Sequence, residues 1–227
     1  IFLYAKQPGC TNFSTLFTIK KALNTTKVGH TGTLDSFAEG LLVVCVGNHT
    51  RLAGKITGFS KKYEAIIAFG TETDTLEYTG NPINQTKLPT YKDLQKSVEN
   101  FTGDILQAPP AFSAVHVDGK RASDLAREGK TVEIPKRPIT VFEAKIDDVI
   151  FEDKNLETVK YAKISFFVSK GTYIRCLARD IAKDCGSSAH LIGLLRTEVG
   201  SFSLKNAVGK LFLKDFYFCI SFSTLAN

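Results

Sequence analysis

The sequence predicts an α+β fold with a mixed, mostly antiparallel central sheet flanked by helices and loops. Segments with helical spacing of apolar residues are interspersed with β-branched and aromatic runs, and they lack the regular strand–helix–strand rhythm of a parallel sheet. The 227 residues are enough for a substantial core. A composition of 43% hydrophobic and 23% charged residues is ordinary for a globular protein.

The first third of the chain is predicted to hold a helix and a long strand. Ser14 is suited to cap a helix in which Leu16, Ile19 and Leu23 fall on one face. The run 62–71 then has the apolar and β-branched character of a strand.

The middle of the chain contains a predicted surface connection, a helix and a basic insertion. Residues 76–89 are polar and carry Pro, Asn and Gly, which favours a surface connection. Thr90 can cap a helix that continues through Leu94, Val98 and Phe101 to a stop near Gly103. Prolines bound the stretch 107–138, which contains a short helix at 122–128 and an excess of basic residues. Composition alone favours a solvated loop there.

The last third is predicted to contain two strands and one helix. The strands cover 139–151 and 161–168, and the helix covers 174–185. Gly186 is well placed as the residue that ends this helix in the left-handed conformation.

Charge and cysteine content restrict the kind of partner and chemistry. A net charge of +6 suits a polyanionic partner, although many basic proteins bind no nucleic acid. The five cysteines and four histidines are scattered, without the spacing of a zinc site or a disulfide framework. Reduced, mostly buried thiols in a cytoplasmic protein without a metal are therefore expected.

No segment predicts attachment to a membrane. No apolar run is long enough to span a bilayer, and no secretion signal is recognisable in a chain that begins without Met. The stretch 211–220 is apolar but short and interrupted by two charges, so it is expected to pack as a terminal segment.

The segment 29–40 is the strongest candidate for a functional loop. It carries one aspartate, Asp35, among three glycines, His30 and two threonines, directly before the apolar run 41–46. A loop held by a rigid strand is a frequent place for catalytic residues. On the residues alone, however, an Asp after such a turn is more often a turn or helix-cap residue.

Four ordered motifs resemble those of the bacterial tRNA pseudouridine-55 synthases, the TruB family of pseudouridine synthases. Gly29-His30-Thr31-Gly32-Thr33-Leu34-Asp35 resembles the catalytic-aspartate motif, and Lys62-Tyr63-Glu64-Ala65 resembles the tyrosine segment. The arginine segment is matched at 169–175, and the last active-site segment is matched at 189–196. The resemblance runs from about Leu3 to Phe202 and implies the pseudouridine synthase fold. It also implies isomerisation of a T-loop uridine of tRNA without cofactor or metal.

The resemblance assigns catalytic roles to three residues. Asp35 would act on the flipped-out nucleotide, as a nucleophile at C1′ or by removing a ribose proton. Arg175 would hold that carboxylate through its guanidinium fork, whereas without the motif it reads as a solvent-facing or phosphate-binding arginine. Tyr63 would stack on the uracil and serve as the C5 base, its alternative being a tyrosine packed in the core.

A second group of residues is expected to contact substrate or RNA. In the family Tyr173 helps to line the pocket, and Leu194 would form an apolar wall against the flipped base; by themselves both read as core residues. His30 is assigned to substrate contact, because a neutral imidazole can stack on a nucleotide or donate a hydrogen bond to it. Lys6 belongs to an N-terminal signature whose RNA contact is in doubt here. The remaining expected phosphate ligands, each individually no better than a surface charge, are Lys120, Arg121, Lys170 and Arg196.

The chain departs from the family pattern at its beginning and end. The N-terminal signature, usually Lys-Pro-x-Gly followed by Thr/Ser-Ser, reads Lys6-Gln7-Pro8-Gly9-Cys10-Thr11-Asn12 here. Many relatives continue into a C-terminal PUA domain, whereas the expectation here is a catalytic domain over 1–210, with its RNA-binding insertion at 107–138. A short tail at 211–227 would follow it.

Several alternatives remain. The expected partner is the T-arm stem-loop of tRNA, without an obligatory protein partner or guide RNA. A guide-RNA-dependent relative would carry the same motifs. A non-catalytic RNA-binding or RNA-folding protein is a different class, which the intact Asp35, Tyr63 and Arg175 disfavour. No motif supports a cysteine-dependent enzyme.

Overall fold

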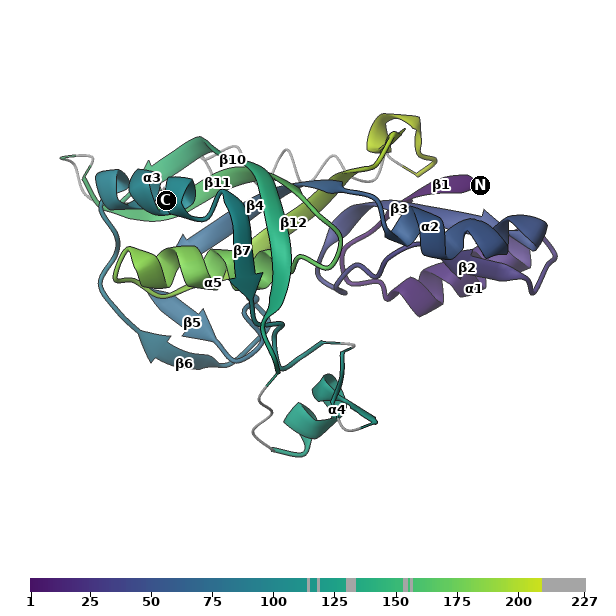
Figure 1. Cartoon of the computed structure of the whole chain (residues 1–227), viewed down its shortest axis with the longest axis horizontal. Coiled ribbons are helices and arrows are strands. Elements are labelled where there is room, and N and C mark those ends of the chain that lie inside the picture. Colours follow the sequence, from purple (N-terminus) through teal and green to yellow (C-terminus); the bar gives the residue numbers. More distant parts are fainter. Residues whose placement is uncertain (114, 118, 130–133, 153–154, 156, 210–227) are drawn as a thin grey trace. The chain divides into compact units, whose positions relative to one another are not determined.

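The computed structural model describes residues 1–113, 115–117, 119–129, 134–152, 155 and 157–209. These residues form two compact units (Figure 1). Unit 1 comprises Ile1–Glu64 and the chain from Gly193 onward, and unit 2 comprises Ala65–Ile192. Strands β4 (Lys61–Phe69) and β12 (Ala189–Val199) each contribute residues to both units.

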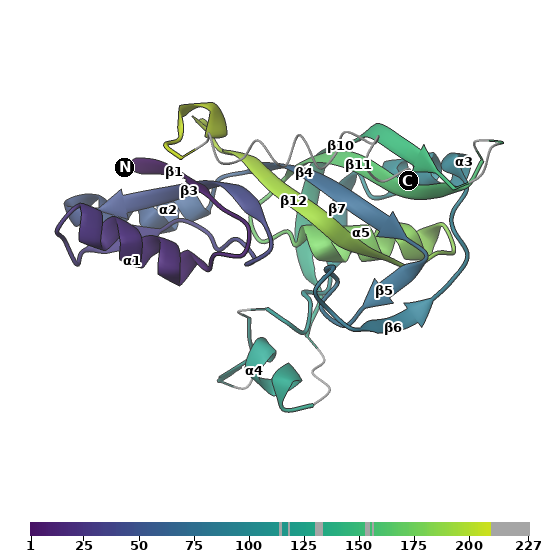
Figure 2. The ribbon, with the colours of Figure 1, turned by 180° about the vertical axis from the view of Figure 1, so that it is seen from behind.

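Unit 1 is built on strand β3 (Glu39–Val46), which is buried almost throughout. Strands β1 (Phe2–Lys6) and β2 (Val28–His30) pair with it antiparallel, and β12 pairs with it in parallel. Helix α1 (Asn12–Ala22) covers one face of these strands, as Figure 2 shows. The remaining elements are η1 (Gly47–Leu52), α2 (Ala53–Thr57), β13 (Phe202–Ser203) and η2 (Leu204–Asn206).

Helix α1 begins earlier than the sequence predicts. Its cap is Thr11, whose side-chain oxygen accepts a hydrogen bond of 3.0 Å from the backbone N–H of Ser14. Ser14 therefore lies in the first turn, and the prediction that it caps the helix is wrong. Ile19 packs against Leu42 and Val44 of β3, whereas the predicted apolar partner Leu23 is exposed at the C-cap.

Unit 2 places two helices beside antiparallel strands. The antiparallel order β11 (Val159–Val168), β10 (Arg137–Phe151), β7 (Gly103–Gln107) forms one side, and β4 lies next to β11. A separate two-stranded sheet joins β5 (Thr71–Thr73) and β6 (Pro82–Gln85). The long helices are α3 (Tyr91–Asn100) and α5 (Ile174–Asp184).

The predicted cap and stop residues of unit 2 are confirmed. Thr90 caps α3 and accepts a hydrogen bond from Asp93 N–H. Helix α5 ends at the predicted place, and Gly186 follows with φ of +67°. The prediction of a surface connection is confirmed for residues 81–87, which are all exposed and include β6, whereas Leu76 at the start of the predicted segment is 5% exposed.

The predicted insertion contains its own small elements. Strands β8 (His116–Val117) and β9 (Lys120–Arg121) pair, and α4 (Ala122–Arg127) follows. Gly129 lies after α4 with φ of +73°. The predicted terminal tail at 211–227 lies outside the described residues.

These pairings confirm the predicted fold class. The sheet is mixed and mostly antiparallel, and the parallel pairing between β3 and β12 matches Leu195 with Glu39 and Arg196 with Gly40. Within the described part of the chain, no helix is both long and apolar enough to cross a membrane.

Candidate active site

Asp35 lies in the loop between β2 and β3 of unit 1. Its side chain is partly exposed, whereas Leu34 before it and Phe37 after it are buried. The two buried neighbours anchor the loop in the core on either side of the partly exposed Asp35. The loop continues directly into β3, the most buried strand of the unit.

Asn12 holds the backbone immediately before Asp35. Its side-chain Nδ2 donates to Leu34 O at 2.5 Å, and its Oδ1 accepts from Leu34 N–H at 3.2 Å. Asn12 is 9% exposed and Leu34 is 3% exposed, so both bonds are shielded from water. Sequence analysis quoted Asn12 only as part of the N-terminal signature and assigned it no role.

Lys6 holds the backbone immediately after Asp35. Its ammonium donates to the carbonyls of Ser36 at 3.1 Å, Ala38 at 2.6 Å and Gln7 at 3.0 Å. Burial lowers the pKa of Lys6 to about 8, while the negative charges of Asp35 and Glu39 act in the opposite direction. The side chain is 0% exposed, which corrects the expectation of a direct RNA contact. Lys6 therefore stabilises the backbone of the Asp35 loop from inside the protein.

Arg196 fixes the two ends of the loop. Its Nε donates to Leu41 O at 2.8 Å and its Nη2 donates to Gly32 O at 3.2 Å. Arg196 is 1% exposed, so the expectation of a phosphate ligand is corrected as well. Gly40 allows β3 and β12 to approach closely, because a Cβ at this position would lie 2.4 Å from Arg196 O. The φ of Gly40 is +106°, a conformation that favours glycine.

His30 ends strand β2 at the entrance to the loop. Burial and then the positive charge of Arg196 lower the pKa of His30 below its ordinary value, which favours the neutral imidazole. Its Nδ1 is buried without a hydrogen-bond partner among the described residues. A buried ring nitrogen without a partner is unusual in folded proteins and is consistent with a ligand contact.

The other predicted residues of unit 1 lie on strands. Tyr63 is on β4 and is 8% exposed, and Leu194 is on β12 and is 4% exposed. Leu194 precedes Leu195, which pairs in register with Glu39 at the end of the Asp35 loop.

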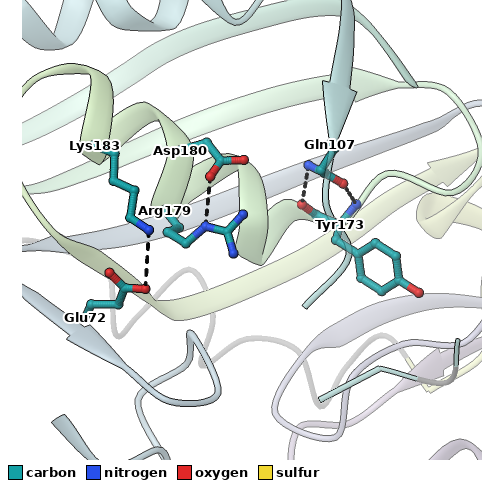
Figure 3. A network of polar contacts seen from close by, with 6 residues as sticks. All are labelled: Glu72, Gln107, Tyr173, Arg179, Asp180 and Lys183. Carbon is teal, nitrogen blue, oxygen red and sulfur yellow. Dashed lines mark hydrogen bonds and ion pairs between the residues drawn. The ribbon is translucent and has the colours of Figure 1, made fainter. Parts of the chain in front are cut away.

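In unit 2, Arg175 and Tyr173 lie at the start of α5. Arg175 is 4% exposed, and its guanidinium donates to Thr75 O at 2.8 Å and Phe112 O at 3.1 Å. Gln107 contacts the backbone of Tyr173 twice: its Nε2 donates to Tyr173 O at 3.1 Å, and its Oε1 accepts from Tyr173 N–H at 2.8 Å (Figure 3).

The contact between Gln107 and Tyr173 repeats in unit 2 the arrangement of Asn12 and Leu34. Gln107 is 2% exposed and is the last residue of β7, where the insertion begins. Because Phe112 also binds Arg175, the beginning of the insertion is tied to the arginine segment at two points. Sequence analysis did not identify Gln107.

The remaining predicted contacts are on the surface. Lys120 and Arg121 of β9 and Lys170 before α5 are exposed.

Asp35 belongs to unit 1 and Arg175 to unit 2, so their ion pair stays a prediction. Nearby on α5, Arg179 is paired with Asp180 at 2.8 Å, as Figure 3 shows.

No metal site is evident in this part of the molecule. Among the described residues, no group of three or more His, Cys, Asp and Glu side chains is arranged to hold a metal ion.

A family model and curated relatives that match this chain all belong to one family of enzymes. Residues 20–174 match the family described as TruB family pseudouridylate synthase (N terminal domain). tRNA pseudouridine synthase B of Treponema denticola is 46% identical over 228 residues, covering 95% of this chain and 64% of the relative. The protein of the same name from Borreliella burgdorferi is 46% identical over 206 residues, covering 90% of this chain and 71% of the relative.

Solved structures support the fold. An H/ACA RNP bound to a substrate RNA containing 2′-deoxyuridine is 23% identical, with a TM-score of 0.67, covering 96% of this chain and 53% of that one. A Cbf5-Nop10-Gar1 complex gives 25% identity and a TM-score of 0.68, covering 96% and 55%. The chain thus spans about two thirds of its curated relatives and about half of these solved chains. On the family match and these identities, the chain belongs to the TruB family of pseudouridylate synthases.

Proposed function

We propose that this chain isomerises a uridine in the T-loop of tRNA, position 55 by family resemblance, to pseudouridine. The observation that carries the proposal is the Asp35 loop. Asp35 is partly exposed, while buried side chains hold the backbone on both sides of it. Such fixation keeps a reactive group in one geometry, which is a major source of rate enhancement.

The proposed reaction breaks the N1–C1′ bond of the uridine, turns the base and rejoins it through C5. The C5 proton is lost and N1 gains one, so the overall change is an isomerisation. Because no electron is transferred and no group is added, the balance requires neither a redox cofactor nor a metal.

Asp35 is the proposed nucleophile at the ribose. A carboxylate must be ionised to act, and a neighbouring guanidinium favours that form. Arg175 is the proposed partner, because its planar fork can hold both carboxylate oxygens. Tyr63 is proposed to stack on the uracil and to remove the C5 proton.

The target nucleotide must leave its stack before it can react. Flipping a base costs on the order of a few kcal/mol, and contacts with aromatic and apolar side chains offset part of this cost. Tyr173 and Leu194 are proposed to supply those contacts. The neutral imidazole of His30, with its unpartnered Nδ1, is suited to a hydrogen bond with the nucleotide.

The proposed partner is the T-arm stem-loop of tRNA, bound without a guide RNA or protein subunit, in the cytoplasm. The name of the curated relatives, tRNA pseudouridine synthase B, supports tRNA as the RNA that is bound. The exposed cations Lys120, Arg121 and Lys170 are proposed to contact phosphates.

A tritium-release assay tests the proposal. A T-arm stem-loop labelled with tritium at C5 of the loop uridine should release label to water without added metal, cofactor or guide RNA. A matched RNA labelled only at a stem uridine should retain its label. Binding without release would instead support an RNA-folding protein. Release only after addition of a complementary guide RNA would support the guide-dependent alternative.

A further inference from the structure

Helix α1 presents an unusual outer face. Phe13 is 78% exposed and Phe17 is 64% exposed, and they are separated by one helical turn. Lys20 and Lys21 continue the same face in the last turn. The opposite face, with Asn12 and Ile19, is buried. Two exposed aromatic rings therefore lie in line with two cations.

The N-terminal end of α1 lies at the Asp35 loop. Asn12, at the first turn of α1, is bonded to Leu34 through both side-chain polar atoms. Phe13 is the next residue along the helix. From Phe13 to Lys21 the helix advances about 12 Å. The aromatic and basic residues are thus arranged along α1 at increasing distance from the Asp35 loop, where the target nucleotide is proposed to bind.

The net charge of unit 1 indicates which class of partner this face binds. In unit 1, residues 1–64 and 193–209 contain ten Lys and Arg against four Asp and Glu, which gives a net charge of +6. In unit 2, residues 65–192 contain 17 Lys and Arg against 18 Asp and Glu, which gives a net charge of −1. Within residues 1–63 the acids are Asp35 and Glu39, and Glu39 is buried. No salt bridge to Lys20 or Lys21 occurs within the described chain. Such a field favours a polyanion over an acid-poor protein surface or a neutral ligand.

Rings alternating with cations match the chemistry of unpaired RNA. Aromatic side chains stack on nucleobases that have left the helix, and lysines contact the phosphates between them. We infer that the outer face of α1, formed by Phe13, Phe17, Lys20 and Lys21, binds the nucleotides that flank the target uridine. This inference rests on the proposed function and adds a binding surface to it.

Two double variants test the surface. Phe13→Ala/Phe17→Ala should weaken binding of the T-arm RNA about tenfold or more, in line with the loss of base stacking. Lys20→Gln/Lys21→Gln should weaken binding and reduce the slope of log Kd against log salt by about 1.4–1.8. Phe13, Phe17 and Lys21 are exposed and Lys20 is half-buried, so unchanged thermal unfolding would verify that the fold is retained in both variants.

Matched controls come from unit 2. Phe142→Ala removes a ring that is 50% exposed, and Lys92→Gln/Lys96→Gln removes two exposed cations from α3. Both controls should leave the affinity and the salt slope close to those of the unaltered chain.

The outcomes separate the inference from the proposed function. If the unaltered chain releases tritium but both α1 variants bind RNA with the original affinity and slope, the inference is overturned and the proposed function stands. If the unaltered chain binds no RNA, both are overturned. If the α1 variants change only self-association, measured by light scattering, the face is a protein-binding surface and the inference is also overturned.

Discussion

Replacing Asn12 by alanine tests how firmly the Asp35 loop must be held. The substitution removes two hydrogen bonds to Leu34, each worth about 1 kcal/mol net. It also leaves the N–H and C=O of a residue that is 3% exposed without those partners, at a cost of about 1–3 kcal/mol for each group before relaxation. After partial relaxation we expect the free energy of unfolding to fall by roughly 2–4 kcal/mol, which lowers Tm by roughly 5–12 °C.

The effect on turnover should exceed the effect on RNA affinity. Asn12 is buried and bonds to the backbone beside Asp35, so its loss displaces the carboxylate without removing an RNA contact. A displacement on the order of 1 Å can reduce the rate about 100-fold. Single-turnover tritium release at saturating RNA gives the rate constant, and filter binding gives Kd.

Two further variants make the measurement specific. Asn12→Asp keeps the acceptor for Leu34 N–H but turns an oxygen toward Leu34 O, so it should be as slow as the alanine variant. Thr18→Ala removes an exposed hydrogen bond within the same helix and should change stability by less than about 0.5 kcal/mol. If Asn12→Ala folds and turns over at the original rate, the loop is positioned without Asn12 and the reasoning is wrong.

Three other predictions concern buried side chains. Arg196→Lys should slow turnover about tenfold or more with little change in Kd, because an ammonium cannot span the two carbonyls; equal single-turnover rates would contradict this. Gln107→Glu should raise KM more than it lowers kcat, because it keeps the bond from Tyr173 N–H and loses the bond to Tyr173 O, whereas an unchanged KM would reject that role. The folded pKa of Lys6, about 8, lies below its unfolded value of 10.5, so the unfolded state holds more protons between these pH values and stability should rise with pH there. Lys6→Met should lose this slope in urea unfolding measured across that range, and identical slopes in both proteins would disprove it.

Local signals in the sequence predicted the helices of unit 2 well. Thr90 at the start of α3 and Gly186 after α5 act through contacts with their immediate neighbours, so their roles are readable from a short window. The cap of α1 was misassigned because Thr11 and Ser14 are both good capping residues. Their mutual hydrogen bond decides which one is outside the helix, and that geometry is absent from the sequence.

The burial of charged side chains by distant parts of the chain could not be predicted from residue type. Lys6 and Arg196 have the charge of phosphate ligands, and only the fold reveals that both are enclosed and bonded to backbone carbonyls. Asn12 and Gln107 are separated from their partners by 22 and 66 residues, so no local pattern links them. The position of Asp35 in a loop before a buried strand, by contrast, follows directly from its glycines and the apolar run after it.

The most direct test of the account compares Asp35→Asn with the unaltered chain in single-turnover tritium release. The substitution preserves the size of the side chain and its place between Leu34 and Ser36, but removes the carboxylate that is the proposed nucleophile. We predict that release disappears while the Kd for the T-arm RNA and the melting temperature stay close to their original values. Release at the original rate by a folded, RNA-binding Asp35→Asn protein would contradict the account.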